Sequence, residues 1–316
     1  MHRVRKVLVG VVACLAVLAA ACDPVSFDTA PDDWSFEGFQ VYSHVPDDPV
    51  GIVYFFHGSG GSAAFATKVE TVDTINELVA RGYGWVATES TERTGDKRWE
   101  VADANPVTNP DLARLDRLHD ELIATTDVAF DTPIFGVGMS NGARMVTLWG
   151  QTLANAGDPV AAVAPFMGRA APLVDAIGGL TIPGFWVIAE NDSVVPNAAI
   201  AVDQAQNAAT GAASVLFTKG EEPLLDARFT RIPEIDETEA DAIEAALLAT
   251  GAWDAQGERV MSIDDTIAAV SGLSLPPSFG ASAADVRSQI QAILALHQYV
   301  GIFKAALANF FDAQLP

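Results

Sequence analysis

The sequence predicts an α/β fold in which a mostly parallel sheet carries helices on both faces. Short, continuous apolar segments alternate along the chain with longer segments whose apolar residues recur at helical spacing. Continuous apolar strands are typical of parallel sheets that are buried on both faces. In the middle of the chain, residues 133–149 combine an apolar strand, a sharp glycine-rich turn and a helical pattern. Together these observations favour one large domain of alternating strands and helices.

Residues 1–21 have the pattern of an export signal. Arg3, Arg5 and Lys6 make the start basic, and the uncharged, almost wholly apolar stretch that follows ends in three alanines. This stretch is shorter than the ~20 residues that a membrane helix needs. No later segment is long and apolar enough to span a bilayer. We therefore expect an exported protein, either extracellular or at the cell surface.

Cys22 follows the alanines directly, and two cleavages of the leader are consistent with this position. The arrangement resembles a bacterial lipoprotein signal, in which the cysteine is lipidated and becomes the first residue of the mature chain. Leu18 lies one position further from the cysteine than the leucine favoured in such signals. Ordinary signal-peptidase cleavage, which would leave Cys22 as a free thiol, is the alternative. A lipid anchor at Cys22 is thus the one membrane partner that we expect.

The body of the chain contains no cysteine, because Cys14 and Cys22 are the only two. It therefore forms no disulfide, and its core alone must stabilise it. The net charge is −23, and loss of the three basic leader residues would leave 15 basic and 41 acidic residues, or −26. Such a surface repels nucleic acid and anionic lipid, and we interpret it as a solvated coat. No cluster of metal ligands is visible, so we expect neither a metal nor an organic cofactor, and the sequence indicates no particular oligomeric state.

The remainder of the chain divides into a tether and a single domain. Residues 22–34 are rich in proline and aspartate, and residues 35–316 make up the α/β domain. An edge strand is expected within 36–45, where polar and apolar residues partly alternate. Buried strands are expected at 51–56, 84–88, 134–137, 160–166, 182–189 and 214–218, and helices at 63–81, 111–125, 237–250 and 283–296.

The turn Gly138-Met139-Ser140-Asn141-Gly142 is the most informative motif in the chain. A strand, G-x-S-x-G and a helix in succession make up the nucleophile elbow, which holds a serine hydroxyl at the carboxyl end of a strand. The small residues on either side let the strand and the helix approach closely. The pattern alone is weak evidence, but the strand and helix that it requires are both present. We predict that Ser140 is a nucleophile; an ordinary glycine-lined turn is the alternative.

The glycine loop at residues 57–61 has two functional interpretations. It matches G-x-G-x-x-A, which is typical of dinucleotide binding, but the acidic residue expected about 20 residues later is missing, since Glu89 comes too late. In the second interpretation, N–H groups of the loop and of Asn141 face a developing oxyanion. We favour the oxyanion hole and expect His57 to shape the loop. A tight turn without a functional role remains the third possibility.

A serine nucleophile needs a base, and the base needs a carboxylate to orient it. In this type of sheet the partners follow in the order serine, acid, histidine. Asp192 follows the buried strand at 182–189 and is the predicted acid, with Glu190 as the alternative. His297 is the only histidine after the nucleophile, so it is the base by elimination. Residues 288–310 read as helix, and this role requires the helical pattern to break near residue 297.

Residues 220–296 form a long helical insertion between the predicted acid and base. Such insertions at the carboxyl edge of a sheet usually cap the substrate cleft; a separate helical lobe without substrate contact is the alternative. We expect Trp99 and Met139 to contact substrate. Phe229 and Trp253 are further candidates for the cleft, although buried core is the commoner position of a tryptophan.

The motifs FFHGSGGSA, ESTERTGDKRW, GVGMSNGARM and AENDSVVP occur in this order. Over residues 50–200 the chain thereby resembles the extracellular polyhydroxybutyrate depolymerase and feruloyl esterase group of α/β-hydrolases. The resemblance implies an α/β-hydrolase fold and a serine esterase of the extracytoplasmic space. It also implies that Ser140, Asp192 and His297 form the triad, and that Ser59 and Asn141 supply the oxyanion N–H groups. Two features depart from the group: the body has no cysteine, and the insertion before the histidine is unfamiliar.

The expected function is hydrolysis of a carboxylic ester, which belongs to a polymer (polyhydroxyalkanoate or aromatic polyester), to a feruloyl ester or to a small soluble ester. A serine peptidase or an acyltransferase would use the same triad. A catalytically silent surface-binding lipoprotein that kept the fold is the non-enzymatic alternative.

Overall fold

The computed structural model describes residues 24–176, 179–273 and 282–316. The predicted export signal and Cys22 lie outside these residues. Within them, no helix has the length and apolar character needed to cross a membrane.

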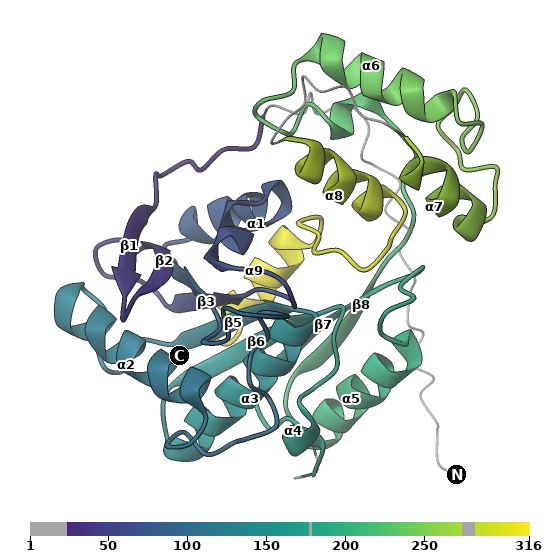
Figure 1. The fold of residues 1–316 in the computed structure, drawn as a ribbon. Helices are drawn as coiled ribbons and strands as arrows, with labels where there is room; N and C mark the ends of the chain where they lie inside the picture. The colour runs from purple at the N-terminus through teal and green to yellow at the C-terminus, as the bar shows by residue number, and fades with distance from the viewer. Residues whose placement is uncertain (1–23, 177–178, 274–281) are drawn as a thin grey trace, which may run out of the picture.

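Eight strands form one sheet in the order β1-β2-β4-β3-β5-β6-β7-β8 (Figure 1). β2 pairs antiparallel with β1 and β4, and the pairs from β4 through β8 are parallel. This mostly parallel order, with an antiparallel edge, is that of the α/β-hydrolase fold. The strands are β1 (Asp32–Phe36), β2 (Phe39–His44), β3 (Ile52–Phe56), β4 (Gly84–Thr88), β5 (Ile134–Met139), β6 (Val160–Phe166), β7 (Gly184–Ala189) and β8 (Ser214–Lys219).

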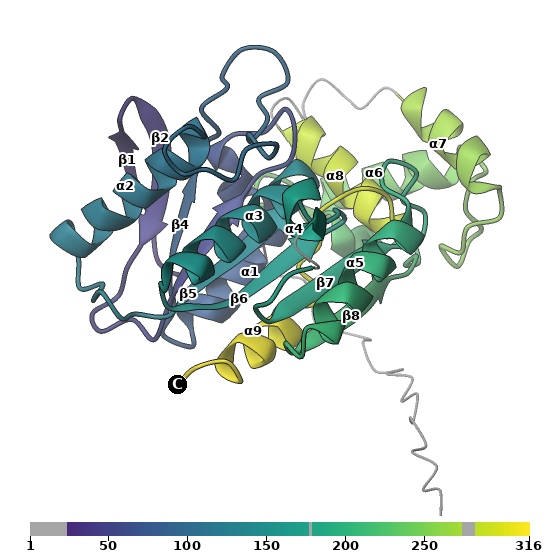
Figure 2. The same ribbon diagram turned by 90° about the horizontal axis from the view of Figure 1, so that it is seen from below.

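Helices cover the two faces of the sheet, as predicted (Figure 2). Apolar residues of α2, α3, α4 and α5 pack on one face, and those of η1, α1 and α9 pack on the other. The helices of these layers are η1 (Ala63–Thr67), α1 (Val69–Val79), α2 (Pro110–Thr125), α3 (Asn141–Ala156), α4 (Pro172–Ala176), α5 (Asn197–Ala209) and α9 (Lys304–Asp312).

The continuous apolar strands are buried on both sides. In β3, Tyr54 and Phe56 belong to one core, whereas Val53 and Phe55 belong to the other. All four side chains are at most 2% exposed. Because full burial of one large apolar side chain stabilises a fold by about 1.5–3 kcal/mol, such strands fix the sheet at the centre of the molecule.

The first strand differs from the prediction. The expected edge strand within 36–45 is a hairpin of β1 and β2, and the turn between them consists of Glu37 and Gly38. Both residues have positive φ, 51° and 84°, as the two-residue turns that suit strand twist require. The hairpin therefore begins at Asp32, inside the segment expected to be a tether.

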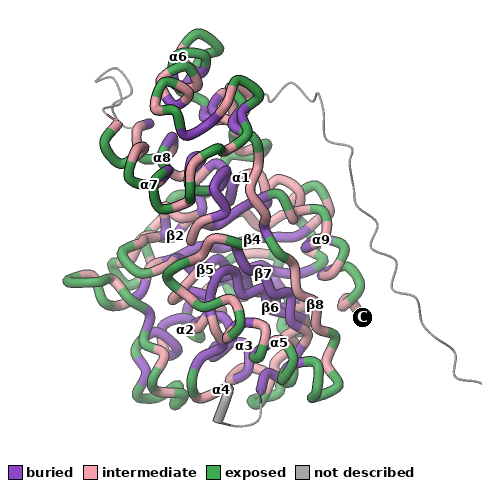
Figure 3. The backbone as a smooth tube through the Cα atoms, turned by 90° about the vertical axis from the view of Figure 1, so that its right-hand side faces the viewer, coloured by how far each residue is buried: buried purple, intermediate pink, exposed green. Residues whose placement is uncertain are grey.

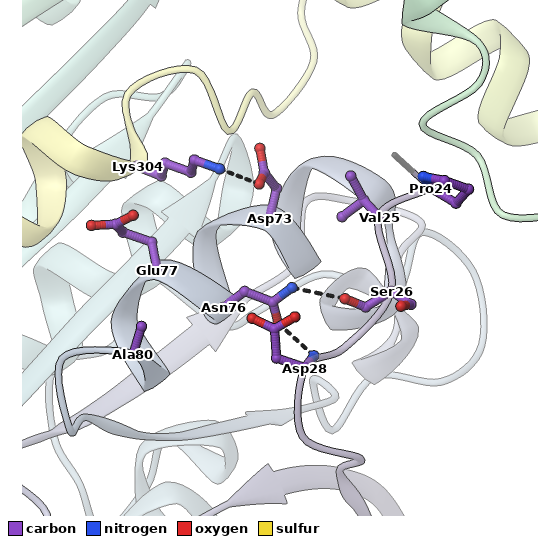
Figure 4. Close-up of a pocket in the computed structure, with 9 residues that line it drawn as sticks. All are labelled: Pro24, Val25, Ser26, Asp28, Asp73, Asn76, Glu77, Ala80 and Lys304. Carbon is purple, nitrogen blue, oxygen red and sulfur yellow. Dashed lines mark hydrogen bonds and ion pairs between the residues drawn. The ribbon is translucent and has the colours of Figure 1, made fainter. Parts of the chain in front are cut away.

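The N-terminal segment, residues 24–28, lies against α1 beside a cavity of about 340 Å³ (Figure 4). The side-chain amide of Asn76 on α1 donates to the carbonyl oxygen of Ser26 at 2.7 Å. Its oxygen accepts from the backbone N–H of Asp28 at 3.1 Å. These contacts dock the segment on the domain, so from residue 24 onward the expected tether is not free.

The insertion is a helical lobe with a core of its own (Figure 3). Two of its helices were predicted, and α7 was not. Phe229 and Trp253 are 0% and 4% exposed and belong to this core. They are therefore not cleft residues. The elements of the lobe are η2 (Asp226–Arg228), α6 (Glu237–Leu248), α7 (Ile263–Ser271) and α8 (Ala283–Ile293).

Candidate active site

Ser140 lies in the turn between β5 and α3, at the carboxyl edge of the sheet. Its backbone has φ 58° and ψ −114°, a combination that residues with a side chain rarely adopt. The backbone N–H of Ser140 donates to the carbonyl oxygen of Phe166 on β6 at 2.9 Å. The carbonyl oxygen of Ser140 accepts from the N–H of Ala143 at 3.0 Å. This is the strained strand-to-helix turn that the motif predicts.

The glycines of the motif allow this turn to form. A Cβ on Gly138 would lie 2.1 Å from the carbonyl oxygen of Gly142. A Cβ on Gly142 would lie 2.2 Å from the carbonyl oxygen of Phe56, the last residue of β3. Any larger residue at either position would push α3 away from the strands and displace Ser140.

The glycine loop at residues 57–61 packs directly on this turn. A Cβ on Gly58 would lie 3.3 Å from the Cβ of Ser140 and 3.1 Å from the sulfur of Met139. The loop leads through Ser62 into the short helix η1, and not straight into a long helix. It therefore lacks the helix N-terminus on which a dinucleotide-binding loop holds its pyrophosphate. Met139 lies between the loop and the turn, and its side chain is partly exposed.

Two backbone N–H groups are available beside Ser140. Among the described residues, no protein group accepts a hydrogen bond from the N–H of Ser59 or of Asn141. Asn141 is the first residue of α3, where amide groups have no partner within the helix. Free N–H groups at a helix start stabilise negative charge. The N–H groups of Ser59 and Asn141, which were predicted to bind an oxyanion, are thus without a protein acceptor in the described residues.

His57 shapes the loop. Its Nδ1–H donates to the carbonyl oxygen of Gly58 at 2.7 Å, and its Nε2 accepts from the backbone N–H of Ser90 at 3.1 Å. The ring is 1% exposed. Burial lowers the pKa of His57 to about 4 against the opposing hydrogen bond to Gly58. With both nitrogens engaged and the ring neutral, His57 is not available as a base.

Asp192 and His297 contact each other across 105 residues of sequence. Nδ1 of His297 lies 2.7 Å from Oδ2 of Asp192. The other carboxylate oxygen accepts from the N–H groups of Val194 and Val195 at 2.8 and 3.0 Å. Burial would raise the pKa of Asp192, but the hydrogen bonds from His297 and the two backbone amides hold it below the ordinary value. The side chain of Asp192 is 0% exposed, whereas Glu190, the alternative acid, is exposed.

The helical pattern breaks around His297, as its predicted role requires. α8 ends at Ile293 and α9 begins at Lys304. Ala295 between them has a positive φ of 50°. Nε2 of His297 is buried and has no hydrogen-bond partner within the described part of the chain, so it does not accept the Ser140 hydroxyl here. Because Nδ1 faces the carboxylate, Nε2 carries the free lone pair that a general base needs.

Phe166 connects the serine turn with the histidine loop. Its carbonyl oxygen binds the N–H of Ser140. Its ring packs on the ring of Tyr299, two residues after His297, with 4.6 Å between the centroids. The hydroxyl of Tyr299 donates to Thr74 on α1 at 3.1 Å. The end of β6 thus holds both segments in one neighbourhood.

Trp99 does not line a cleft. Its side chain is 2% exposed, and its indole N–H donates to the carbonyl oxygen of His57 at 2.9 Å. The polar residues around Trp99 in the sequence suggested an exposed aromatic. The loop that carries Trp99 instead packs against the glycine loop, so the indole is buried in the core.

A cavity of about 310 Å³ lies between α7 and α8, and Leu296, the neighbour of His297, forms part of its wall. Its apolar lining comes from Ile267, Val270, Leu273, Ile290, Leu294 and Leu296, with Arg287 and Gln291 among the polar groups. The main-chain carbonyls of Leu294 and Ala295 accept from the side chain and the N–H of Asn191, at 2.9 and 3.0 Å. The insertion therefore contacts Asn191, the neighbour of Asp192, and ends beside His297 in the sequence.

Within residues 24–176, 179–273 and 282–316, no group of three or more His, Cys, Asp or Glu side chains is arranged to hold a metal ion.

No family model matches the chain, and no curated protein sequence is similar enough to match it. Several solved structures are similar in chain trace. Est1E from Butyrivibrio proteoclasticus, solved with ferulic acid bound, matches at 14% identity and a TM-score of 0.42, over 60% of this chain and 90% of that one. A fungal esterase from Rhizomucor miehei matches at 13% identity and a TM-score of 0.44, over 60% of this chain and 72% of that one. An esterase from Pyrococcus furiosus matches at 14% identity and a TM-score of 0.43, over 61% of this chain and 83% of that one.

Identities and TM-scores this low say nothing about activity. The strand order, the parallel pairing and the strained serine turn stand independently of these matches. On those features the chain has the fold of the α/β-hydrolases.

Proposed function

We propose that this protein is a serine hydrolase that cleaves carboxylic esters. The observation that carries the proposal is the pairing of His297 with the buried carboxylate of Asp192 at 2.7 Å, in the same neighbourhood as a serine on a strained elbow. A histidine without a catalytic role needs neither a buried carboxylate at one ring nitrogen nor a free lone pair at the other, whereas a general base needs both.

In the proposed mechanism, Nε2 of His297 removes the hydroxyl proton of Ser140 as the serine oxygen bonds to the ester carbonyl carbon. The N–H groups of Ser59 and Asn141 bind the resulting oxyanion. The tetrahedral intermediate then breaks its bond to the alcohol oxygen, which takes the proton from His297. Water repeats the sequence on the acyl-serine, releasing the acid and restoring the free serine. Asp192 holds the imidazole in the required tautomer and stabilises its charged form.

The finer parts of the proposal concern substrate and location. We propose an ester with an apolar acyl or alcohol part, because the cavity between α7 and α8, whose wall includes Leu296, is lined largely by leucine, isoleucine and valine. Polyhydroxyalkanoate, aromatic polyester and feruloyl esters all have this character. We further propose that the chain is exported and that Cys22 carries a lipid anchor. A peptidase or an acyltransferase on the same triad is the second candidate, since an amide or an acyl acceptor could occupy the same geometry.

The test uses Ser140→Ala in an assay with p-nitrophenyl esters and a fluorophosphonate label. The variant should lose turnover by about 10⁴-fold or more and take up no label, because it lacks the attacking oxygen. Ser35→Ala is the matched control, since it removes an exposed serine hydroxyl on β1, outside the proposed site. Full activity of Ser140→Ala would disprove the proposal. Parallel assays of ester, peptide and acyl-transfer products separate the three reaction classes.

A further inference from the structure

Trp99 contacts both halves of the proposed oxyanion hole. One half is the glycine loop that starts at His57, and the other is Asn141 at the start of α3. These two segments are far apart in the sequence, and β4 and α2 separate them along the chain. Trp99 comes from a third segment, the loop between β4 and α2.

The side chain of Trp99 supports the glycine loop. Its indole N–H donates to the carbonyl oxygen of His57 at 2.9 Å. The indole also lies against the imidazole of His57, with 4.9 Å between the ring centroids, and packs edge-on against Phe56 at 5.3 Å. The position of the loop that carries Ser59 therefore depends on the depth to which this indole is buried.

The backbone of Trp99 holds Asn141. Its N–H donates to Oδ1 of Asn141 at 2.7 Å, and its carbonyl oxygen accepts from Nδ2 at 3.4 Å. The side-chain amide of Asn141 is thus bound on both its polar atoms by one residue. This fixes the first turn of α3, which carries the second free N–H.

The loop that carries Trp99 is hydrogen-bonded to the start of α2. The buried carboxylate of Asp111 accepts from the N–H of Glu100 at 2.7 Å and from the N–H of Thr91 at 2.6 Å. The side-chain amide of Asn109 donates to the carbonyl oxygen of Glu100 at 2.9 Å. Both ends of the loop around Trp99 are therefore fixed to the start of one helix, and the tryptophan has a rigid base.

We infer that Trp99 is a positioning residue that sets the distance between the two N–H donors, at Ser59 and at Asn141. The inference rests on the proposed function, because it needs an oxyanion for the donors to bind. Such donors act by being held in place before charge develops, so a small displacement weakens the transition state more than the bound substrate. Loss of the contacts of Trp99 should therefore lower kcat and leave KM nearly unchanged.

Two variants remove the two contacts separately. Trp99→Phe keeps an aromatic ring in the core but loses the hydrogen bond to His57. Asn141→Ala keeps the backbone N–H donor but loses both bonds to Trp99. Each should lower kcat by about 10- to 100-fold, less than the loss of a whole donor, with KM changed less than about 3-fold. The double variant should lose less than the product of the two effects, because both act on one arrangement.

Trp186→Phe is the matched control. Trp186 is also fully buried, and its indole N–H also donates to a side chain, Asn207, at 3.1 Å. This variant removes the same kind of bond from β7, away from the glycine loop, so its kcat should stay within about 2-fold of wild type even if its melting temperature falls.

The outcomes are distinguishable. If the wild-type protein shows no turnover and no labelling of Ser140, the proposed function fails. If wild type turns over but Trp99→Phe and Asn141→Ala keep its kcat, the inference is overturned. A fall in kcat that Trp186→Phe shares equally would also overturn it, since general destabilisation would then explain the loss. Should Trp99→Phe not fold, the separate effects of Asn141→Ala on kcat and on KM decide.

Discussion

The backbone N–H of Gly301 donates to the carboxylate of Glu70, with 2.6 Å between the nitrogen and Oε2. Gly301 lies in the loop that carries His297, and Glu70 lies in the first turn of α1. The same carboxylate pairs with Arg231 at 2.6 Å and with Arg228 at 3.1 Å, both from the insertion. One buried acid thus joins the sheet layer, the insertion and the histidine loop.

Glu70→Gln should destabilise the protein strongly. Burial would raise the pKa of Glu70, but Arg228, Arg231 and hydrogen bonds hold it below the ordinary value. The carboxylate is therefore charged at neutral pH, and its removal leaves two largely buried guanidinium groups short of a partner. We expect a loss of about 3–5 kcal/mol in the free energy of unfolding, measured with urea.

The control for this variant is Asp285→Asn. Asp285 pairs with Lys68 at 3.0 Å, and both side chains are more exposed, at 24% and 42%. Its loss should cost below ~1 kcal/mol. Equal effects of the two variants would contradict the central role given to Glu70.

Acid should destabilise the fold partly through His57. Its pKa is about 4 in the folded protein and 6.5 ordinarily. Between pH 6.5 and 4 the unfolded chain therefore binds a proton that the folded chain does not, so stability falls as pH falls and levels off below about pH 4. The contribution amounts to about 3 kcal/mol.

This pH dependence can be isolated with His57→Gln. The variant should be less stable than wild type at pH 7, because the amide replaces two good hydrogen bonds imperfectly. The gap in unfolding free energy should narrow as pH falls to 4. Parallel stability curves for the two proteins over this range would show that His57 does not contribute.

Asp192→Asn should lower kcat by about 10³- to 10⁴-fold, because the amide no longer selects the tautomer of His297 that leaves Nε2 free. Turnover of p-nitrophenyl acetate measures the loss. Glu190→Gln is the control at the same strand end, and it should keep activity near wild type because Glu190 is exposed. The reverse ranking would make Glu190 the acid.

Val270→Phe should change the preference for acyl or alcohol size. Val270 on α7 lines the cavity between α7 and α8 without belonging to the proposed triad, and the phenyl ring introduced there would fill part of the cavity volume. Bulky or long esters should lose about 10-fold in kcat/KM relative to acetate esters. Ile302→Phe changes a residue of a different cavity and should leave the preference unaltered. A size profile unchanged by Val270→Phe would show that substrate does not enter this cavity.

The sequence predicts most of the sheet and the chemistry at its edge. Local patterns carried this information: continuous apolar strands, and the glycines around Ser140. Chain order and elimination led to Asp192 and His297, and their contact is observed. The helices α4, α5 and α7 were not predicted. α7 has apolar residues at helical spacing, Ile263, Ile267 and Val270, but its 9 residues are fewer than the window in which such spacing is informative.

The contacts that support the site could not be predicted from the sequence, because they join residues that are far apart along the chain. Trp99 was expected in a cleft, and 42 residues separate it from each of its partners, His57 and Asn141. Asp111 and Asn109 look like ordinary capping residues at a helix start, and Asn109 does cap α2. Nothing local indicates that both also hold the loop of Trp99 from below.

Residues 24–28 dock on α1, so the fixed part of the domain begins two positions after the proposed lipidation site at Cys22. Cys22 precedes Pro24 by two positions, a reach of only ~7 Å when fully extended. The fatty acyl group that we propose on Cys22 would therefore hold the domain close to the bilayer. A domain anchored over so short a distance could not move far from the membrane. The proposed reaction would then take place on esters that diffuse to the cell surface.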